Sequence, residues 1–332
     1  MKKVLSILLA LTMLFAMTAC ATNPENGDGE TDPNAGTTDV QRLIMVTGGD
    51  AGTYYAFGGV IASVLTEKSA GQLEVTAVTS GASSANCTSL VNGEAELAIM
   101  QNDVLGYAVT GTETMADKGA MPSLRAIASL YPEAVQLVAL QESGIQSVAD
   151  LKGKKVCVGD AGSGTETNAK QVLEAYGLTF DDIDVQYLSF SEASTAMQNG
   201  TVDAAFATSA LPNSAIVELT TKKDIVVVPI DGEGADALIA KYPFYSKTII
   251  PADNYGSDSD VGTVAMLATL VCTEDLSEDT VYLITKTLFE NTDALIAGNA
   301  RGNDVKLEAA KAGVTVDFHP GALKYFAEQG LE

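Results

Sequence analysis

Two glycine-rich turns carry the residues best suited to bind a small molecule. The first turn contains Gly48, Gly49 and Gly52, and the second runs over residues 159–164. Each turn follows a short apolar run that predicts a strand, and each precedes the apolar periodicity of a helix. Glycine lets the backbone approach a ligand closely, and a helix start offers unpaired N–H groups at the positive end of the helix dipole. This combination favours a small anion. Neither turn carries a G-x-x-x-x-G-K-[ST] or G-x-G-x-x-G nucleotide motif.

Further polar residues follow other predicted strands. In α/β sheets, ligands bind beyond the C-terminal ends of the strands. The loop at 80–83 and the segment 101–103 are both predicted to lie at such ends. The predicted ligand-binding residues are Thr53, Tyr54, Tyr55, Ser80, Gly81, Ser83, Gln101, Asp103, Tyr131, Gly162, Ser163, Gly164, Thr165 and Asn168.

Several of these residues have an equally reasonable structural interpretation. Tyr54 and Tyr55 could pack in the core, and the polar residues of 101–103 could cap a loop. Glu166 completes a Ser-x-x-Glu capping box, so we interpret it as a helix cap rather than a ligand contact. Asn168 faces a ligand only if the first turn of its helix does. The candidate loops contain no arginine or lysine, so amides and hydroxyls would have to hold the anion.

The side chains give little support for catalysis or metal binding. The single histidine, His319, stands at the start of the last predicted helix and is predicted to cap it. After Cys20, the cysteines are Cys87, Cys157 and Cys272, which fit no zinc spacing and are interpreted as buried apolar residues. Whether two of them pair stays open. The chain has neither a G-x-S-x-G elbow nor a Ser-His-Asp candidate set. We therefore predict a binding protein, not an enzyme, with no cofactor and no metal.

The N-terminus predicts export. Two lysines precede an apolar run at 4–16, which is too short to span a bilayer of about 30 Å. This layout predicts a lipoprotein signal peptide over 1–20, with lipidation of Cys20; an ordinary signal peptide with an incidental cysteine is the alternative. Residues 21–40 are rich in Gly, Pro, Asn and Asp and are predicted to form a disordered tether. The mature protein would be extracytoplasmic and held to the membrane only by its lipid.

The charge and the strand pattern restrict the remaining possibilities. A formal net charge of −24 argues against nucleic acid and anionic lipid headgroups as partners. Strands alternate with short helices, which predicts an α/β fold with a largely parallel sheet. Pro132 interrupts the apolar run 124–139, so we interpret that run as a domain crossing rather than one regular strand. With a return crossing at 242–251, the predicted domains are 41–130 plus 250–332, and 131–249.

A set of motifs in order resembles the TAXI family of solute receptors. The motifs are GGDAGTYYAFGG, SLYPE, GSGTETNAKQVLEAYGLTFDD, DAAF followed by LP, KYPFY and HPGALKYFAEQG, spread from about residue 43 to the C-terminus. The resemblance implies a two-domain, type II periplasmic-binding-protein fold with a hinge and a ligand cleft between the domains. It also implies a small carboxylate ligand, such as glutamate or a similar C4–C5 dicarboxylate, and a TRAP membrane permease as partner.

Three other functions are compatible with the sequence. The receptor of an ATP-driven importer would share the fold and differ in its permease. An enzyme could use a pair of carboxylates in acid–base chemistry. An adhesive surface lipoprotein would have no buried cleft for a small molecule.

Overall fold

The strands of the described residues, 40–331 of this computed structural model, join in a single ten-stranded sheet. In chain order they are β1 (Gln41–Val46), β2 (Leu73–Val78), β3 (Leu97–Gln101), β4 (Leu124–Leu140), β5 (Lys155–Cys157), β6 (Asp184–Gln186), β7 (Ala204–Ser209), β8 (Ile225–Val228), β9 (Ser246–Ile250) and β10 (Val261–Thr273). The α-helices are α1 (Thr53–Lys68), α2 (Ser83–Val91), α3 (Asn102–Thr110), α4 (Gly164–Ala175), α5 (Phe190–Gln198), α6 (Ser214–Thr220), α7 (Gly232–Lys241), α8 (Glu278–Glu290), α9 (Thr292–Gly298) and α10 (Pro320–Glu328).

Two long antiparallel strands, β4 and β10, run through the middle of this sheet. Its order is β2-β1-β3-β10-β4-β7-β5-β6, with β9 paired to β10 and β8 paired to β4. The outer strands β1, β2 and β3 pair in parallel, as do β5, β6 and β7, whereas every pairing of β4 and β10 is antiparallel. The sheet is therefore mixed, and the expectation of a largely parallel sheet is correct only for its two ends.

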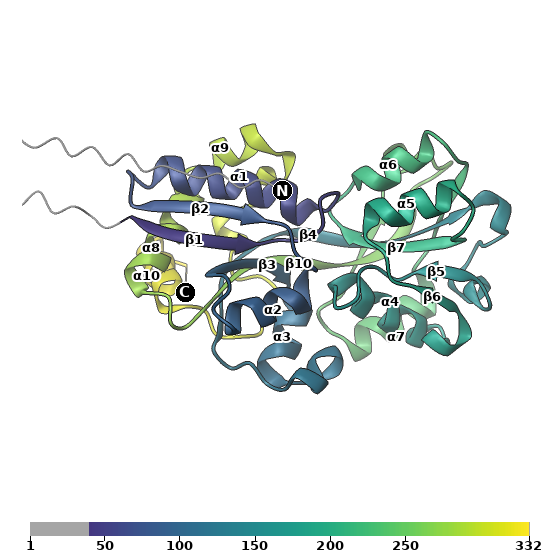
Figure 1. Ribbon diagram of the computed structural model, residues 1–332, viewed down its shortest axis with the longest axis horizontal. Coiled ribbons are helices and arrows are strands. Elements are labelled where there is room, and N and C mark those ends of the chain that lie inside the picture. The colour runs from purple at the N-terminus through teal and green to yellow at the C-terminus, as the bar shows by residue number, and fades with distance from the viewer. Residues whose placement is uncertain (1–39, 332) are drawn as a thin grey trace, which may run out of the picture. The chain divides into compact units, whose positions relative to one another are not determined.

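The helices gather around the two parallel ends of the sheet. Figure 1 shows β1–β3 with α1–α3 and α8–α10 at one end, and β5–β7 with α4–α7 at the other. We call these the α1 side and the α4 side. The predicted domain boundaries at 130 and 249 fall inside β4 and β9, and the division into two domains at these positions stays a prediction.

β4 continues through Pro132, so the prediction that this proline rules out a single strand over residues 124–139 is wrong, while the domain crossing stays a prediction. On one edge, Pro132 faces Leu267 of β10, next to a register shift between Ala268 and Thr269. On the other edge, pairing with β7 begins only at Ala134. Proline lacks an N–H group and is tolerated at bulges and at unpaired strand edges. Both conditions are met at this position.

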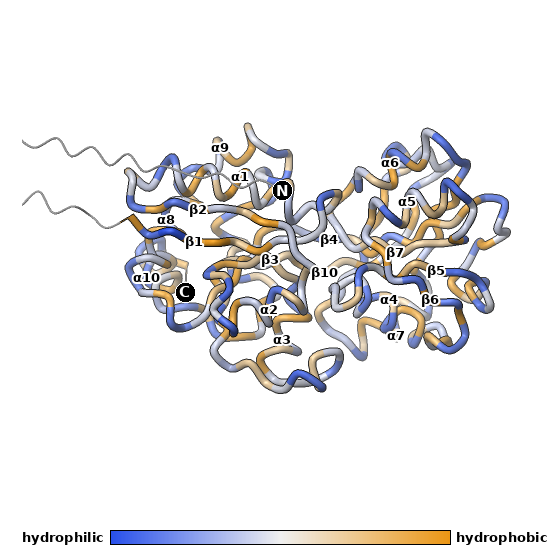
Figure 2. Tube along the Cα trace, viewed as in Figure 1, coloured by the Kyte–Doolittle hydropathy of each residue, from blue (hydrophilic) through white to orange (hydrophobic). Residues whose placement is uncertain are grey.

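The apolar face predicted for the first helix packs into the core. Phe57, Ile61 and Leu65 of α1 are fully buried. The Phe57 ring meets the Tyr131 ring edge to face, with 5.6 Å between their centroids. Figure 2 shows hydrophobic stretches along the central strands and hydrophilic stretches at the outer loops. This packing fixes α1 against the sheet with its first turn at the C-terminal end of β1.

Two local predictions from the sequence are confirmed. His319 caps α10, because its Nδ1 accepts a hydrogen bond from the Gly321 N–H at 3.2 Å. Cys87, Cys157 and Cys272 are buried and form no disulfide with one another. Within residues 40–331, no helix combines the length and the apolar character needed to cross a membrane. The predicted signal peptide, Cys20 and the tether over 21–39 lie outside the described residues.

Candidate functional site

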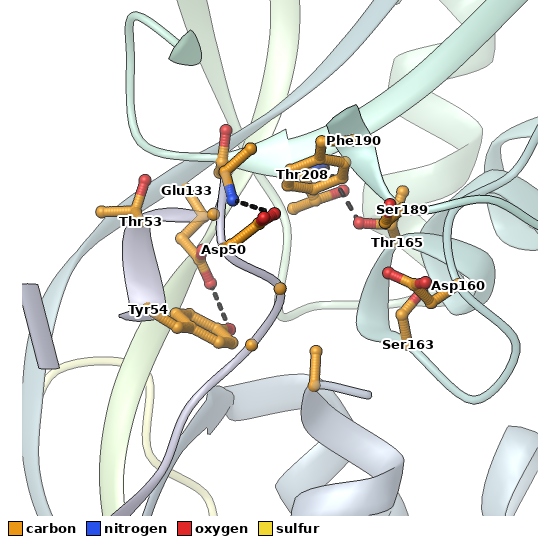
Figure 3. A pocket seen from close by; sticks show the side chains of 16 residues that line it. Asp50, Thr53, Tyr54, Glu133, Asp160, Ser163, Thr165, Ser189, Phe190 and Thr208 are labelled. Atoms are coloured by element: carbon orange, nitrogen blue, oxygen red, sulfur yellow. Dashed lines mark hydrogen bonds between the residues drawn. The ribbon is translucent and has the colours of Figure 1, made fainter. Parts of the chain in front are cut away.

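A small cavity lies where helix starts of the α1 side face those of the α4 side. Its volume is about 40 Å³, which is room for roughly three water-sized groups. Figure 3 shows the side chains of its wall. They come from both glycine turns, the middle of β4 and the starts or ends of neighbouring elements: Gly48, Gly49, Asp50, Ala51, Gly52, Thr53, Tyr54, Ala82, Glu133, Asp160, Ser163, Thr165, Ser189, Phe190, Thr208 and Ser209.

The helix N-termini around this cavity differ in how they are capped. Ser163 caps α4 by accepting a hydrogen bond from the Glu166 N–H, and Ser189 caps α5 in the same manner. The first turn of α2 receives a backbone acceptor, since the Ser84 N–H donates to a carbonyl of the second glycine turn. The N-cap of α1 is Gly52, which has no side chain to offer. The first amides of α1 are therefore the ones most available to a ligand.

Glu133 is a buried carboxyl group in the cavity wall. It is 1% exposed, and the Tyr54 hydroxyl donates to its Oε2 at 2.6 Å. Burial raises the pKa of Glu133 to about 8, with the hydrogen bond from Tyr54 opposing the rise and the charge of Asp103 adding to it. At neutral pH the side chain is mostly protonated. Among the described residues, no group donates to its other oxygen, Oε1.

Two further carboxyl groups line the cavity from the glycine turns. Asp50 is exposed and Asp160 is half-buried. Desolvation raises the pKa of Asp160, and the charges of Glu192 and Asp50 add to the rise. The described lining residues include no lysine, arginine or histidine. The wall therefore carries three carboxyl groups and no basic side chain.

The hydroxyl of Thr208 is buried at the cavity without a partner. Thr208 is the last residue but one of β7 and is 5% exposed. Its N–H donates to the Thr165 Oγ1 at 3.3 Å, whereas its own Oγ1 has no hydrogen-bond partner among the described residues. Buried hydroxyl groups are usually satisfied by protein or water, so an unpaired one in a cavity wall is a candidate ligand contact.

Hydrogen bonds join the two sides around the cavity. Ser191 of α5 donates to Asp50 Oδ1 at 3.1 Å, and Ser214 of α6 donates to the Ala51 carbonyl at 3.2 Å. On another side, the Ser84 N–H donates to the Gly162 carbonyl at 3.1 Å. A solute much larger than the cavity can enter only if these contacts open.

Next to the cavity, a second group of polar side chains fills the contact between α3 and α4. Asn168 accepts from Gln101 Nε2 at 3.0 Å, and its Nδ2 donates to Asp103 Oδ2 at 3.2 Å and to the Tyr245 hydroxyl at 2.8 Å. Tyr245 in turn donates to Gln171 Oε1 at 2.6 Å. Burial raises the pKa of Asp103 to about 7. We call these five residues the contact network.

The structure divides the predicted site residues between these two regions. Thr53, Tyr54, Ser163 and Thr165 line the cavity. Gln101, Asp103 and Asn168 belong to the contact network, and Gly164 packs directly against the Gln101 side chain. The segment 101–103 is not a loop, because α3 begins at Asn102 immediately after β3. Gln101 and Asp103 consequently point into the helix contact rather than into the cavity, and Asn102 bonds instead to the backbone of Gly313 and Leu267.

The remaining predicted residues lie outside the cavity wall. Ser80 donates to Asn86 Oδ1 at 2.6 Å, and Ser83 accepts from the Gln101 N–H at 3.2 Å. Gly162 donates its N–H to Glu166 at 2.6 Å, while Gly81 is half-buried beside Ala85. Tyr55 is 39% exposed on another face of α1, and Tyr131 is 1% exposed in the core.

Several cavity residues were not predicted from the sequence. The polar or aromatic side chains in this group are Asp50, Glu133, Asp160, Ser189, Phe190, Thr208 and Ser209. Most of them follow predicted strands on the α4 side or lie within the two glycine turns, so the rule that selected 80–83 would also have selected them. Glu133 offers no such signal, because it lies in the middle of β4.

The profile of the NMT1-like family matches residues 45–330, almost all of the described chain. The chain belongs to the NMT1-like family. Among curated proteins, the putative aliphatic sulfonates-binding protein of Escherichia coli K12 is 40% identical over 73 residues. That match covers 22% of this chain and 23% of the relative, so less than a quarter of the relative's length is spanned.

Solved structures establish the fold. A putative L-cystine ABC transporter protein from Listeria monocytogenes superposes with a TM-score of 0.51 at 16% identity, over 80% of this chain and 99% of that one. A protein from Bordetella bronchiseptica RB50 gives a TM-score of 0.51 at 17% identity, over 86% and 88%. The predicted type II periplasmic-binding-protein fold is confirmed.

The family assignment made from the sequence motifs is wrong. The profile that matches is that of the NMT1-like family, and the curated relative is named for binding aliphatic sulfonates, so the chain is not assigned to the TAXI receptors. The predictions of a TRAP permease partner and of a glutamate or dicarboxylate ligand followed from that resemblance, and they are wrong for the same reason. The curated relative is named as a binding protein, and the non-enzymatic role of this chain stays a prediction.

Proposed function

We propose that this protein is the solute-binding protein of an ABC-type importer and works outside the cytoplasm. The observation that carries the proposal is a cavity between the α1 side and the α4 side in a chain of type II periplasmic-binding-protein fold. Polar groups from both sides meet there, as expected for a receptor that closes on a small molecule.

The names of similar proteins support the importer class. The curated relative is named for binding aliphatic sulfonates, and a structural neighbour is described as a putative L-cystine ABC transporter protein. Sulfonates and amino acids are small polar solutes, and the contacts between the two sides must open to admit them to a cavity of about 40 Å³. Lipidation at Cys20 and the tether over 21–40 would keep such a receptor close to a membrane permease. The predicted hinge crossings, one of them in β4, would let the two sides separate.

We assign solute binding to the cavity rather than to the contact network. Of the predicted residues, Thr53, Tyr54, Ser163 and Thr165 belong to the proposed site, together with the carboxyl groups of its wall. The side chains of the contact network bond mainly to one another and hold α3 against α4. They act on solute binding through the closure of the two sides.

Uptake measurements test the importer class. A thermal-shift screen of the full chain against sulfonates, phosphonates and amino acids first identifies a stabilising solute, since a ligand at 100 times its Kd adds about 2.7 kcal/mol of stability. Uptake of that solute should then disappear when the gene is deleted. Depletion of cellular ATP by arsenate should stop the uptake. Uptake that survives ATP depletion and fails only when ion gradients are collapsed would contradict an ABC importer.

A further inference from the structure

The charges of the cavity wall point away from a purely anionic solute. Glu133, Asp50 and Asp160 reach the cavity from three different elements (Figure 3), and no basic side chain among the described lining residues neutralises them. Ionising a carboxyl group that is buried without a positive partner is costly, so Glu133 stays mostly protonated in the empty cavity, and the wall offers an added anion no positive side chain. A positively charged group placed between the carboxyl groups removes this cost.

We propose that the solute carries an ammonium group, and that Glu133 and Asp160 hold this group with Asp50 beside them. The inference rests on the proposed function and names the chemical class of its solute. Glu133 is 1% exposed and keeps one carboxyl oxygen without a donor, which is the acceptor that an ammonium N–H requires.

Thr208 gives independent support for a polar guest. Its side-chain oxygen is buried in the cavity wall and has no partner among the described residues. This hydroxyl can accept a hydrogen bond from an ammonium group or donate one to the rest of the solute. A cavity that stays dry would instead be expected to have an apolar wall.

A bare metal ion fits this wall less well than an ammonium group. Within residues 40–331, no three His, Cys, Asp or Glu side chains come close enough together to hold a metal. An ammonium group accepts carboxylates that are further apart, because its N···O distances of about 2.7–2.9 Å exceed the metal–oxygen distances of about 2.0–2.6 Å. The uncapped first turn of α1, on the wall that Gly52 and Thr53 form, can receive an anionic end of the same solute.

Binding of an ammonium group should displace a proton from Glu133. Burial raises the pKa of Glu133 to about 8. The titratable groups that face it are Tyr54 of α1, Tyr131 of β4 and Asp103 of α3. The segment 300–304, which packs against β4, adds Arg301, whose charge acts on Tyr131 and which is paired with Asp304 at 3.1 Å. Below that pKa the incoming cation must replace the proton, so affinity should rise up to tenfold per pH unit from 6 to 8 and then level off.

A panel of matched compounds tests the ammonium group directly. Thermal shifts of the full chain are measured with taurine, ethanesulfonate and ethylamine, and with glycine and acetate, alongside CaCl₂ and MgCl₂. The proposal expects taurine to exceed ethanesulfonate, and glycine to exceed acetate. An amine-free acid that matches or exceeds its amine, a shift with the metals alone, or no shift at all would overturn it.

Calorimetry then locates the group in the cavity. For the best amine of the panel, the wild type should bind about tenfold more tightly at pH 7 than at pH 6 and release close to one proton. Glu133→Gln should weaken binding at pH 8 by at least tenfold and abolish the pH dependence. Glu233→Gln, at an exposed position, is the matched control and should behave as the wild type.

A second variant tests the site independently, in case Glu133→Gln does not fold. Asp160→Asn, at a half-buried position, should also weaken amine binding, whereas Asp181→Asn on the exposed surface should not. Wild-type affinity in both cavity variants, or equal affinity at pH 6 and 8, would contradict the assignment.

If ethanesulfonate binds best and its uptake needs ATP, the importer stands and the ammonium site fails. If amines bind as expected and uptake survives ATP depletion, the ammonium site stands and the importer fails.

Discussion

Two groups of buried polar side chains meet at the start of α4, and they differ in how their hydrogen bonds are satisfied. In the contact network, Asn168 bonds to three partners, and Asp103 accepts from both Asn168 and the Val104 N–H. Of the side-chain oxygens and nitrogens of this network, one, Gln101 Oε1, is buried without a partner among the described residues. In the cavity, Thr208 keeps a buried hydroxyl without a partner among the described residues, and Glu133 uses one of its two oxygens, Oε2, to accept from Tyr54. The first arrangement holds two helices together, and the second is ready for a guest.

The comparison separates stability from binding. Polar groups that satisfy one another lose stability when one of them is removed, since the partner stays buried and unpaired. Polar groups without a partner contribute little to stability, and their removal should be felt mainly by a ligand. Four predictions test this distinction, beginning with the largest expected effect.

The free energy of unfolding should fall as pH rises from about 5.5 to 8. Burial raises the pKa of Glu133 to about 8 and that of Asp103 to about 7, well above their ordinary values near 4. In this window the folded chain holds protons that the unfolded chain has lost. Each such proton lowers the free energy of unfolding by about 1.4 kcal/mol per pH unit. Urea unfolding followed by circular dichroism at several pH values measures the slope.

The two carboxyl groups can be distinguished by variants. Glu133→Gln should remove most of the slope between pH 7 and 8, where Asp103 goes from about half to about one-tenth protonated, and should leave more of the slope below pH 7. The exposed Glu233→Gln should follow the wild type. A free energy of unfolding that is constant or rises between pH 5.5 and 8 would mean that neither group is protonated in the folded state.

Asn168→Leu should destabilise the protein by about 3 kcal/mol. The substitution leaves the amide of Gln101 and the carboxyl group of Asp103 buried without their partner, at about 1–3 kcal/mol for each. Asn303→Leu, at an exposed position, should change stability by less than about 0.5 kcal/mol. Urea midpoints at pH 7 make the measurement. Equal midpoints for the two variants would show that the contact network does not stabilise the fold.

Gly164→Val should cost about 2 kcal/mol of stability and also weaken solute binding. A Cβ at Gly164 would lie 2.2 Å from Gln101 Oε1, so the Gln101 side chain must turn away and give up its hydrogen bond to Asn168. Overpacking of this kind typically costs about 1–3 kcal/mol. The matched variant is Gly59→Val, where nothing lies within 4 Å of the added atom. Calorimetry with the best solute of the panel should show weaker binding for Gly164→Val and unchanged binding for Gly59→Val. An unchanged affinity of Gly164→Val would show that the contact network does not influence how the two sides close on the solute.

Local sequence patterns were sufficient to predict element boundaries that depend only on neighbouring residues. The glycine turns before α1 and α4 and the His319 cap of α10 follow from neighbouring residues, and all are present. The continuation of β4 through Pro132 could not be predicted this way. It depends on a register shift opposite β10 and on the late start of pairing with β7, which are contacts between distant segments.

For the candidate site too, local patterns predict some residues and contacts between distant segments decide others. Thr53, Tyr54, Ser163 and Thr165 line the cavity because helix starts lie at the ends of parallel strands, which is a local rule. Gln101 also ends a strand, yet α3 begins at once and turns its side chain toward α4. Glu133 enters the cavity wall only because β4 crosses between the two sides, and its position follows from the whole sheet.

The smallest expected effect on stability belongs to Thr208→Val, which keeps the shape of the side chain and removes the unpaired hydroxyl. Because this oxygen has no partner among the described residues, its loss should leave the free energy of unfolding within about 0.5 kcal/mol of the wild type. The neighbouring Thr165→Val removes the acceptor of the Thr208 N–H and should cost about 1 kcal/mol. In calorimetry with the best solute of the panel, Thr208→Val should bind several-fold more weakly. The opposite result would be a Thr208→Val protein that is less stable than the wild type and binds the solute with wild-type affinity. The Thr208 hydroxyl would then stabilise the fold, as the contact network does, and would not serve solute binding.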